Sequence, residues 1–259
     1  SRVAVGDRVC PTFSPGWIAG APDADAVRRT RGGVVPGVAA RSVTVGEGEL
    51  VRAPAGLSDE AAACLPCAGL TAWTAVIEHG RVRPGHTVLV IGSGGVSTFA
   101  VAFARAAGAR VFAVTTSADK AERLAGLGVA HVVDRTAEPR WGRAIRAASD
   151  GGVDLVVEVG GAGTLAQSLD AVRVGGTVAV IGNLAGAVEP VSVLPILMKQ
   201  VRCQGVFVGS RRSFESMNAA IERQGIEVQI GARFPFDALP DALAAAAAGV
   251  FGKICLTPA

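Results

Sequence analysis

From residue 87 onward the hydrophobic positions form short continuous runs, which alternate with longer Ala-rich stretches. A strand that is buried on both faces reads as a continuous apolar run rather than an alternating one. The runs therefore predict strands at residues 87–91, 110–115, 131–134, 153–159, 177–181 and 201–208. The stretches between them predict helices at about residues 96–107, 119–127, 140–149 and 163–173. This alternation predicts an α/β fold built on a doubly wound parallel sheet.

The two ends of the chain have a different pattern. Before residue 87, short runs at 6–9 and 41–45 are broken by Gly and Pro clusters, which predicts an irregular β-rich domain. After residue 207 the pattern predicts helices at 214–224 and 237–248 and strands at 226–234 and 252–256. These later elements can return to the first domain. Within the sheet region, helix ends are predicted at Gly108, Gly128 and Gly175.

Composition narrows the class of protein. Half of the 259 residues are hydrophobic, but no apolar run reaches the length of a membrane-spanning helix, and no export signal follows Ser1. The net charge is +3 and the cationic residues are spread along the chain, so we expect neither a nucleic-acid nor a membrane partner. Five cysteines, an odd number, fit a reducing cytoplasm. The excess of Ala, Gly and Arg over Lys is typical of a high-GC bacterial genome.

A glycine-rich turn follows the first predicted strand of the sheet. Its residues are Gly92, Ser93, Gly94, Gly95, Val96 and Ser97. In such a turn the first glycine allows a tight bend, the second lets the backbone approach a pyrophosphate, and a small third residue lets helix and strand pack closely. The free amides at the start of the next helix would meet the phosphates. A purely structural turn is the alternative reading.

The end of the second strand bears on which dinucleotide would bind. An acid there would hold the adenosine ribose hydroxyls and repel a phosphate. The strand ends instead in Thr115, Thr116 and Ser117, followed by Lys120. Hydroxyl donors with a nearby cation suit a 2′-phosphate, which favours NADP(H) over NAD(H). Alternatively, Ser117 only caps the next helix and Lys120 is a solvated surface charge.

At this point several segments together resemble the medium-chain dehydrogenase/reductase superfamily, in its NADPH-dependent quinone-reductase-like and alcohol-dehydrogenase-like branch. Besides the turn at 92–97, they are the segments at residues 5–9, 57–62, 66–73, 181–184, 208–211 and 251–254. The resemblance implies a partial GroES-like domain formed by residues 1–75 and 209–259, and a Rossmann domain at 76–208. It also implies a homodimer that forms through a sheet edge.

The resemblance also assigns residues to the cofactor. It implies that Thr71 lies near the nicotinamide, the turn under the pyrophosphate, and Ser117 with Lys120 at the adenosine phosphate. Further positions are implied on the nicotinamide side or close to the cofactor: Gly160, Gly182, Leu184, Val208, Gly209 and Lys253. As alternatives, the small residues are ordinary turns at strand ends, and Thr71 only starts a helix.

Two departures from the family bear on its chemistry. The segment at residues 5–9 is normally preceded by a sizeable part of the catalytic domain, so we expect either a fragment or a shortened protein. Four closely spaced cysteines, the family's structural zinc lobe, do not occur between Cys10 and Cys64. Cys67 matches a catalytic zinc ligand, but its partners would lie before Ser1, so we expect no zinc. We expect Cys64 and Cys67 to be buried structural thiols.

The sequence names no catalytic acid or base. It contains no Tyr, and its histidines, His79, His86 and His131, have no evident reason to face a substrate. The first hypothesis is zinc-independent hydride transfer from NADPH to an activated carbonyl, quinone or enone as the small-molecule substrate. The second is a reductase-like scaffold kept for binding or for non-redox, cyclase-type chemistry. The third is a structural partner that associates through its sheet edge.

Overall fold

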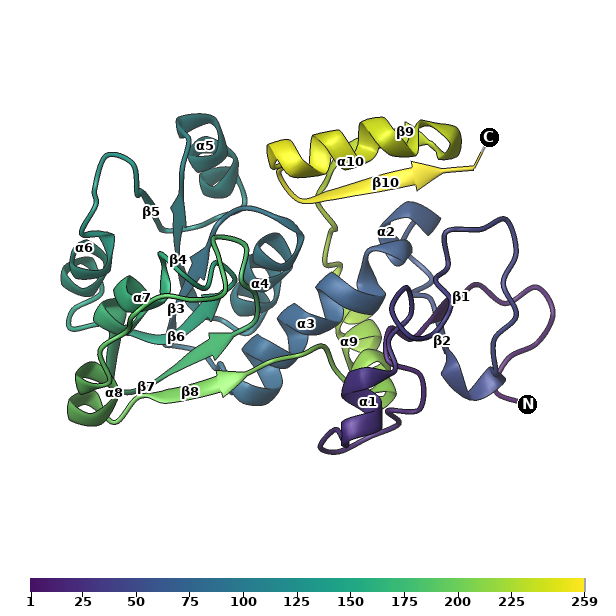
Figure 1. Ribbon diagram of the computed structural model, residues 1–259, viewed down its shortest axis with the longest axis horizontal. Coiled ribbons are helices and arrows are strands. Elements are labelled where there is room, and N and C mark those ends of the chain that lie inside the picture. The colour runs from purple at the N-terminus through teal and green to yellow at the C-terminus, as the bar shows by residue number, and fades with distance from the viewer. Residues whose placement is uncertain (259) are drawn as a thin grey trace. The chain divides into compact units, whose positions relative to one another are not determined.

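The computed structural model describes residues 1–258, which form two compact units. The first unit contains residues 1–71 together with the chain from residue 207 onward, and the second contains residues 72–206. The division expected from the sequence lies at residues 75 and 208. The elements of both units are labelled in Figure 1.

The second unit is built on one parallel sheet. Its strands are β3 (Thr87–Ile91), β4 (Arg110–Thr115), β5 (His131–Asp134), β6 (Val153–Glu158), β7 (Val172–Val180) and β8 (Arg202–Gly205). They lie in the order β5-β4-β3-β6-β7-β8, and every neighbouring pair is parallel. The chain winds outward in one direction from β3 and in the other from β6, so the topological switch point lies between these two strands. The predicted α/β fold with a doubly wound parallel sheet is confirmed.

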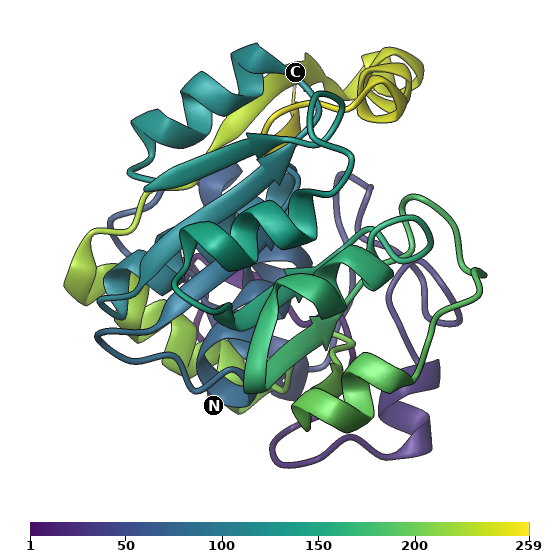
Figure 2. The same cartoon turned by 90° about the vertical axis from the view of Figure 1, so that its left-hand side faces the viewer.

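Helices cover both faces of this sheet (Figure 2). They are α4 (Gly95–Ala106), α5 (Ala118–Gly126), α6 (Trp141–Ala148), α7 (Leu165–Ala171) and α8 (Leu194–Lys199). On one face Trp141, Ile145 and Leu169 join the apolar side chains of the strands in a single core. On the opposite face the ring of Phe103 in α4 stacks on Phe99 and meets Trp73 edge-on. In the part of the chain that the structure describes, no helix has both the length and the apolarity needed to cross a bilayer.

The start of β7 differs from the prediction. A helix was expected to residue 173 with Gly175 at its end, but α7 stops at Ala171 and β7 begins at Val172. Gly175 lies inside β7 with a φ of +71°, where the pairing with β6 shifts register. Gly175 therefore lies at an irregularity within a strand. Such a position favours a left-handed backbone, as the end of a helix does.

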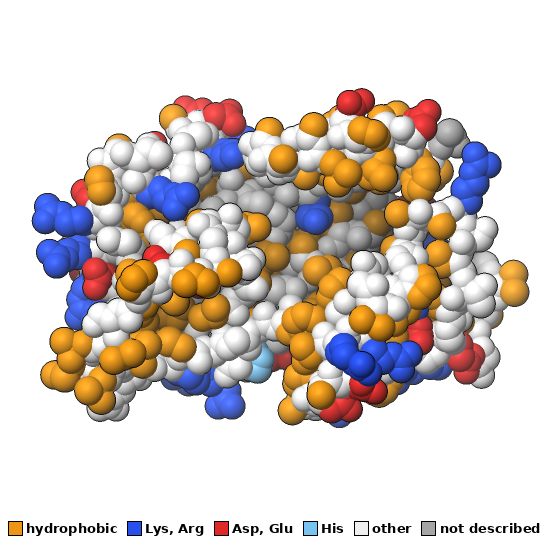
Figure 3. Space-filling view, viewed as in Figure 1, with side chains coloured by type: hydrophobic (Ala, Val, Ile, Leu, Met, Phe, Trp, Pro, Cys, Tyr) orange, Lys and Arg blue, Asp and Glu red, His pale blue; other side chains and the backbone are white. Residues whose placement is uncertain are grey.

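Helix α8 leaves much of its apolar surface uncovered. Lys199 at its C-terminal end donates hydrogen bonds to the carbonyls of Leu169 and Asp170, at 2.7 and 2.9 Å, which ties α8 to the end of α7. Leu194, Leu197 and Met198 remain exposed. Figure 3 shows hydrophobic side chains gathered over this helix, at the lower left.

The first unit has less sheet than the sequence suggested. Strands β1 (Val9–Pro11) and β2 (Leu50–Arg52) pair antiparallel, whereas β9 (Ile230–Pro235) and β10 (Lys253–Thr257) pair parallel. Its helices are α1 (Ala24–Arg28), α2 (Asp59–Ala63), α9 (Arg211–Gln224) and α10 (Leu239–Ala248). Residues 41–45, one of the short runs from which the β-rich domain was predicted, form no strand.

A helical run at residues 59–79 was not predicted. After α2 come a π-helical turn at Leu65–Gly69, the short helix α3 (Leu70–Trp73) and a second π-helical turn at Thr74–His79. Pro66 and Gly69 interrupt the apolar pattern, and both residues disfavour a regular α-helix. The wider π turns accommodate them, so the segment stays helical despite its composition.

Candidate functional site

The glycine-rich turn lies where β3 ends beside the switch point. Gly92 adopts a φ of +78°, and its N–H donates to the carbonyl of Val114 at 2.7 Å. Helix α4 then starts after Gly94 without any side-chain cap, so the first amides of the helix have no partner within it. A Cβ built on Gly94 would meet no atom within 4 Å. Open space beside unpaired amides is the geometry that accepts an anion.

Ser97 faces the protein rather than this space. Its hydroxyl donates to the carbonyl of Ile91 at 2.8 Å, and the residue is buried. The side chain therefore ties α4 to the end of β3, and any contact with a ligand would come from its backbone. Ser93 is also buried, which leaves the backbone as the main ligand-facing surface of the turn.

At the end of β4 the hydroxyl residues divide into two groups. Thr115 is buried, whereas Thr116 is exposed and Ser117 is half-buried. Ser117 caps α5, because its oxygen accepts from the N–H of Lys120 at 3.2 Å. The capping role considered for Ser117 is thus present, but accepting that bond leaves the hydroxyl proton free to donate elsewhere. Lys120 itself is half-buried.

Asp134, the acid on the strand next to the end of β4, is hydrogen-bonded within its own loop. Asp134 pairs in register with Thr115, but its carboxylate accepts from the N–H and the hydroxyl of Thr136, at 2.8 and 2.7 Å. The hydroxyl and N–H of Thr136 lower the pKa of Asp134. The carboxylate of Asp134 is therefore engaged by Thr136 and is not free to face the end of β4.

The loops that follow β6 and β7 are packed together. Ala185 N–H donates to the carbonyl of Gly160 at 2.8 Å. A Cβ on Gly182 would lie 2.5 Å from the carbonyl oxygen of Val159, so only glycine allows this approach. Gly160, Gly182 and Leu184, which the sequence pointed to separately, are thus brought into one cluster, with the side chain of Leu184 exposed.

Sequence reasoning missed the residue beneath this cluster. Glu158, the last residue of β6, is fully buried. Its Oε1 accepts from the N–H groups of Gly160 and Gly161 at 2.7 and 3.1 Å and from the hydroxyl of Thr164 at 2.6 Å. Its Oε2 accepts from the hydroxyl of Ser168. The available signal was an acid at the end of a strand whose preceding three residues, 155–157, are all apolar.

In the first unit the structure groups Thr71, Cys67 and Lys253. Thr71 is buried, and both Thr71 and Lys253 lie close enough to the thiol of Cys67 to lower its pKa. Atoms packed around the sulfur raise the pKa of Cys67, although Lys253 and Thr71 partly offset this rise. Cys67 is exposed rather than buried, so the expectation that it is a buried structural thiol is wrong.

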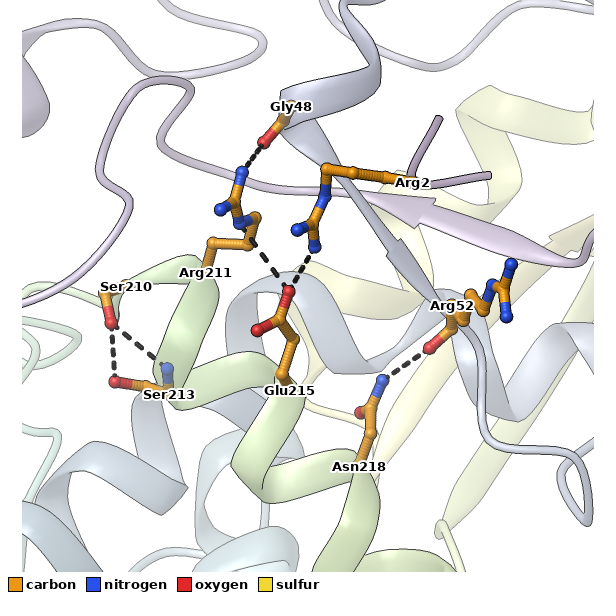
Figure 4. A network of polar contacts seen from close by, with 8 residues as sticks. All are labelled: Arg2, Gly48, Arg52, Ser210, Arg211, Ser213, Glu215 and Asn218. Atoms are coloured by element: carbon orange, nitrogen blue, oxygen red, sulfur yellow. Dashed lines mark hydrogen bonds and ion pairs between the residues drawn. The ribbon is translucent and has the colours of Figure 1, made fainter. Parts of the chain in front are cut away.

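Val208 and Gly209 lead into α9 and are buried. The helix is fixed by a polar network (Figure 4), in which Ser210 caps its first turn and Asn218 donates to the carbonyl of Arg52 at 2.8 Å. Arg211 donates to the carbonyl of Gly48 at 2.5 Å, and Glu215 pairs with both Arg211 and Arg2. This network holds the start of α9, and with it the preceding two residues, within the first unit.

The thiols do not form a metal site. In residues 1–258 no three His, Cys, Asp or Glu side chains come together to hold a metal ion. The sulfur of Cys64 lies 3.7 Å from that of Cys255, and both of these thiols are buried. Burial, with the neighbouring Cys255, raises the pKa of Cys64 to about 12, and burial raises that of Cys10 to about 11. These two thiols are therefore protonated at neutral pH.

Comparison with known proteins places these features in a family. Residues 95–223 match the family model described as zinc-binding dehydrogenase. A zinc-type alcohol dehydrogenase-like protein of Schizosaccharomyces pombe is 37% identical over 245 residues, which cover 92% of this chain and 70% of that protein.

Solved structures of alcohol dehydrogenases have the same fold as this chain. A crystal structure from Sinorhizobium meliloti, assigned as an alcohol dehydrogenase, is 39% identical with a TM-score of 0.92, over 98% of this chain and 75% of the other. The structure of an NAD-dependent alcohol dehydrogenase is 29% identical with a TM-score of 0.87, over 98% of this chain and 76% of the other.

Proposed function

Because this chain belongs to the zinc-type alcohol dehydrogenase-like proteins of the medium-chain dehydrogenase/reductase superfamily, which are oxidoreductases, we propose that it transfers a hydride from NADPH to an activated carbonyl, quinone or enone. One observation carries the proposal. The turn at Gly92–Ser97 offers unpaired helix amides beside open space at the switch point of the sheet. Ligands of doubly wound sheets bind in the crevice at that point.

The residues of the turn fit the diphosphate of a dinucleotide. The amides at the start of α4 would donate to its oxygens, and the positive end of the helix dipole would favour its charge. Gly94 leaves room for the phosphates because no atom lies where a side chain would stand. When bound, the nicotinamide supplies the hydride. The protein's part is to bind, orient and exclude water, and we name no catalytic acid or base among its side chains.

The choice of NADPH over NADH rests on the end of β4. Thr116 and Ser117 offer hydroxyl donors, Lys120 offers a cation, and the nearby Asp134 is tied to Thr136. Such a group of donors favours the additional phosphate of NADPH. Thr115 is buried, so its part would be to support the neighbouring residues. One structural neighbour is described as NAD-dependent, which makes the cofactor preference a direct test.

The nicotinamide side is assigned through the family. Gly160, Gly182 and Leu184 would lie beside it. The resemblance to the family also implies a cofactor role for Thr71, Val208, Gly209 and Lys253. No step is assigned to zinc, because the described side chains do not fit the metal that the family name implies.

The test places a side chain in the space that the diphosphate would occupy. Gly94 has a φ of −77° and open space around it, so Gly94→Asp should fold while placing a negative charge where the diphosphate would lie. NADPH binding, titrated by fluorescence, should weaken at least about tenfold. Gly56→Asp is the matched control, because Gly56 is exposed with equally open surroundings. Unchanged NADPH affinity in Gly94→Asp would overturn the proposal.

A second measurement separates catalysis from binding. Wild-type protein with NADPH should lose the absorbance of the reduced nicotinamide when an enone, quinone or aldehyde acceptor is added. Saturable binding without oxidation by any acceptor would instead support the scaffold hypothesis.

We also propose that the chain forms a homodimer through the β8 edge of its sheet. β8 has a neighbour on one side only, and the apolar side chains of α8 beside it are exposed. A second copy that covers Leu194, Leu197 and Met198 would remove this apolar surface from water.

A further inference from the structure

We propose that Glu158 is a positioning residue whose buried carboxylate holds the loops after β6 and β7 in the arrangement that receives the nicotinamide half of the cofactor. The proposal deepens the proposed function and rests on it. Glu158 itself would touch neither cofactor nor substrate.

The position of Glu158 in the sheet is the first step. β6 is the neighbour of β3, and Val157 pairs with Val90, so Glu158 ends its strand beside the end of β3. On its other side Glu158 pairs with Val180 of β7. Glu158 therefore ends β6 at the switch point, in a strand that lies between β3 and β7.

The contacts of the carboxylate are the second step. An ionised carboxylate can only accept hydrogen bonds, and the four groups around this one are able to donate: two backbone N–H groups and the hydroxyls of Thr164 and Ser168. Within residues 1–258 no cation pairs with it. All four donors belong to the segment that immediately follows β6, so the charge acts entirely on the shape of this loop and the start of α7.

The loop after β6 packs directly against the loop after β7. Ala162 N–H donates to the carbonyl of Gly186 at 2.9 Å, and Leu184 N–H donates to the carbonyl of Val159 at 3.3 Å. Gly161 has a φ of +76°, and a Cβ there would lie 2.7 Å from the oxygen of Gly186. The two loops fit together without slack, so displacing the first must displace the second.

The adenosine side is independent of this anchor. Thr116, Ser117 and Lys120 belong to the β4 end and α5, and none of them contacts Glu158 or either loop among the described contacts. Loss of the carboxylate should therefore affect the two halves of the cofactor differently. A general loss of stability would affect them alike.

The experiment compares two ligands by calorimetry: NADPH and adenosine 2′,5′-bisphosphate, which carries the adenosine side without the nicotinamide. In Glu158→Ala we expect NADPH affinity to fall at least about tenfold, and affinity for the fragment to change less than about twofold. Glu158→Gln should restore part of the difference, because its amide oxygen still accepts from Gly160 and Gly161 while its NH₂ can donate to Ser168. Equal loss of both ligands, or loss of neither, would overturn the proposal.

Hydrogen exchange gives a readout that needs no cofactor. In Glu158→Ala the amides of residues 159–163 and 182–186 should exchange faster, whereas those of α4 should keep their protection. If Glu158→Ala does not fold, Thr164→Val removes one donor to Oε1 with little change of shape and should show the same pattern more weakly. Unchanged exchange in both loops would overturn the anchoring role. Wild-type protein that binds neither ligand would refute the proposed function, while the exchange result would still decide the anchor.

Discussion

The hydroxyl of Ser97 donates a hydrogen bond of 2.8 Å to the carbonyl of Ile91, and so joins the first turn of α4 to the last residue of β3. Both groups are buried. Ser97→Ala would leave that carbonyl without its side-chain donor, so we expect it to lower the free energy of unfolding by about 1–2 kcal/mol. Urea unfolding measures this, with the exposed Ser42→Ala as control. A loss no larger than that of the control would contradict the role given to this bond.

Lys120 is expected to distinguish the two cofactors. Lys120→Ala removes a cation beside the proposed 2′-phosphate seat, so NADPH should bind at least about tenfold more weakly, and NADH less than about twofold. Titration of both nucleotides measures the difference, and Arg143→Ala, which removes an exposed charge on α6, is the control. Equal effects of Lys120→Ala on NADPH and NADH binding would show that the lysine does not distinguish the two cofactors.

The sheet could be predicted from the sequence because its signals are local. Continuous apolar runs, such as residues 87–91, reflect burial on both faces, and the glycines after them mark the turn that needs a positive φ at Gly92. Gly175 misled the prediction because a helix end and a strand irregularity make the same demand on the backbone. The difference between them is set by pairing with β6, which the local sequence does not encode.

The unpredicted parts of the site depend on contacts between distant residues. Cys64 meets Cys255 across 191 positions of sequence, and no spacing rule anticipates that pair. Glu158 was visible as one of two acids in a largely apolar strand, but its role depends on how the loops after β6 and β7 fold over it. The helical run at 59–79 was hidden because Pro66 and Gly69, which disfavour a regular α-helix, interrupt its apolar pattern.

Asp154 should make stability depend on pH. Its carboxylate accepts from Thr87 N–H and from Arg173, both at 2.7 Å. Burial raises the pKa of Asp154, but the hydrogen bond from Thr87 and the guanidinium of Arg173 outweigh it and hold the pKa below its ordinary value of 3.8. A pKa lowered by folding stabilises the protein fully above the unfolded-state pKa, and this stabilisation is lost as the pH falls through the folded-state pKa.

Asp154→Asn should therefore lower the free energy of unfolding by about 1–3 kcal/mol at pH 7. The difference from wild type should shrink as the pH falls below about 4, where the wild-type carboxyl also becomes neutral. Urea unfolding across that range measures both effects. Asp237→Asn, at an exposed aspartate, is the control. A difference that stays constant down to the lowest pH would mean that the charge of Asp154 contributes nothing.

The five thiols should differ sharply in reactivity. The thiolate is the reactive form, and Cys10, Cys64 and Cys255 are buried, with the pKa of Cys64 raised to about 12 and that of Cys10 to about 11. Burial of the sulfur also raises the pKa of Cys67 and of Cys203, but both residues are exposed, so native protein at pH 8 should react faster with a disulfide reagent such as DTNB at these two thiols than at the three buried ones. All five should react once the protein is unfolded. Cys67→Ser and Cys203→Ser should each remove one fast thiol. A fast native count above two would show that the buried thiols open readily.

The proposed homodimer predicts that one surface charge can separate the subunits. Leu197 on α8 is 71% exposed, and a second copy covering it would have to bury any charge placed there without a partner. Wild-type protein should have twice the 26.1 kDa chain mass in light scattering, whereas Leu197→Glu should have the mass of one chain. Leu243→Glu, at a leucine of α10 that is 61% exposed, is the matched control and should leave the mass doubled. A wild-type mass of one chain would refute the dimer, and a doubled mass in Leu197→Glu would show that α8 does not lie in the interface.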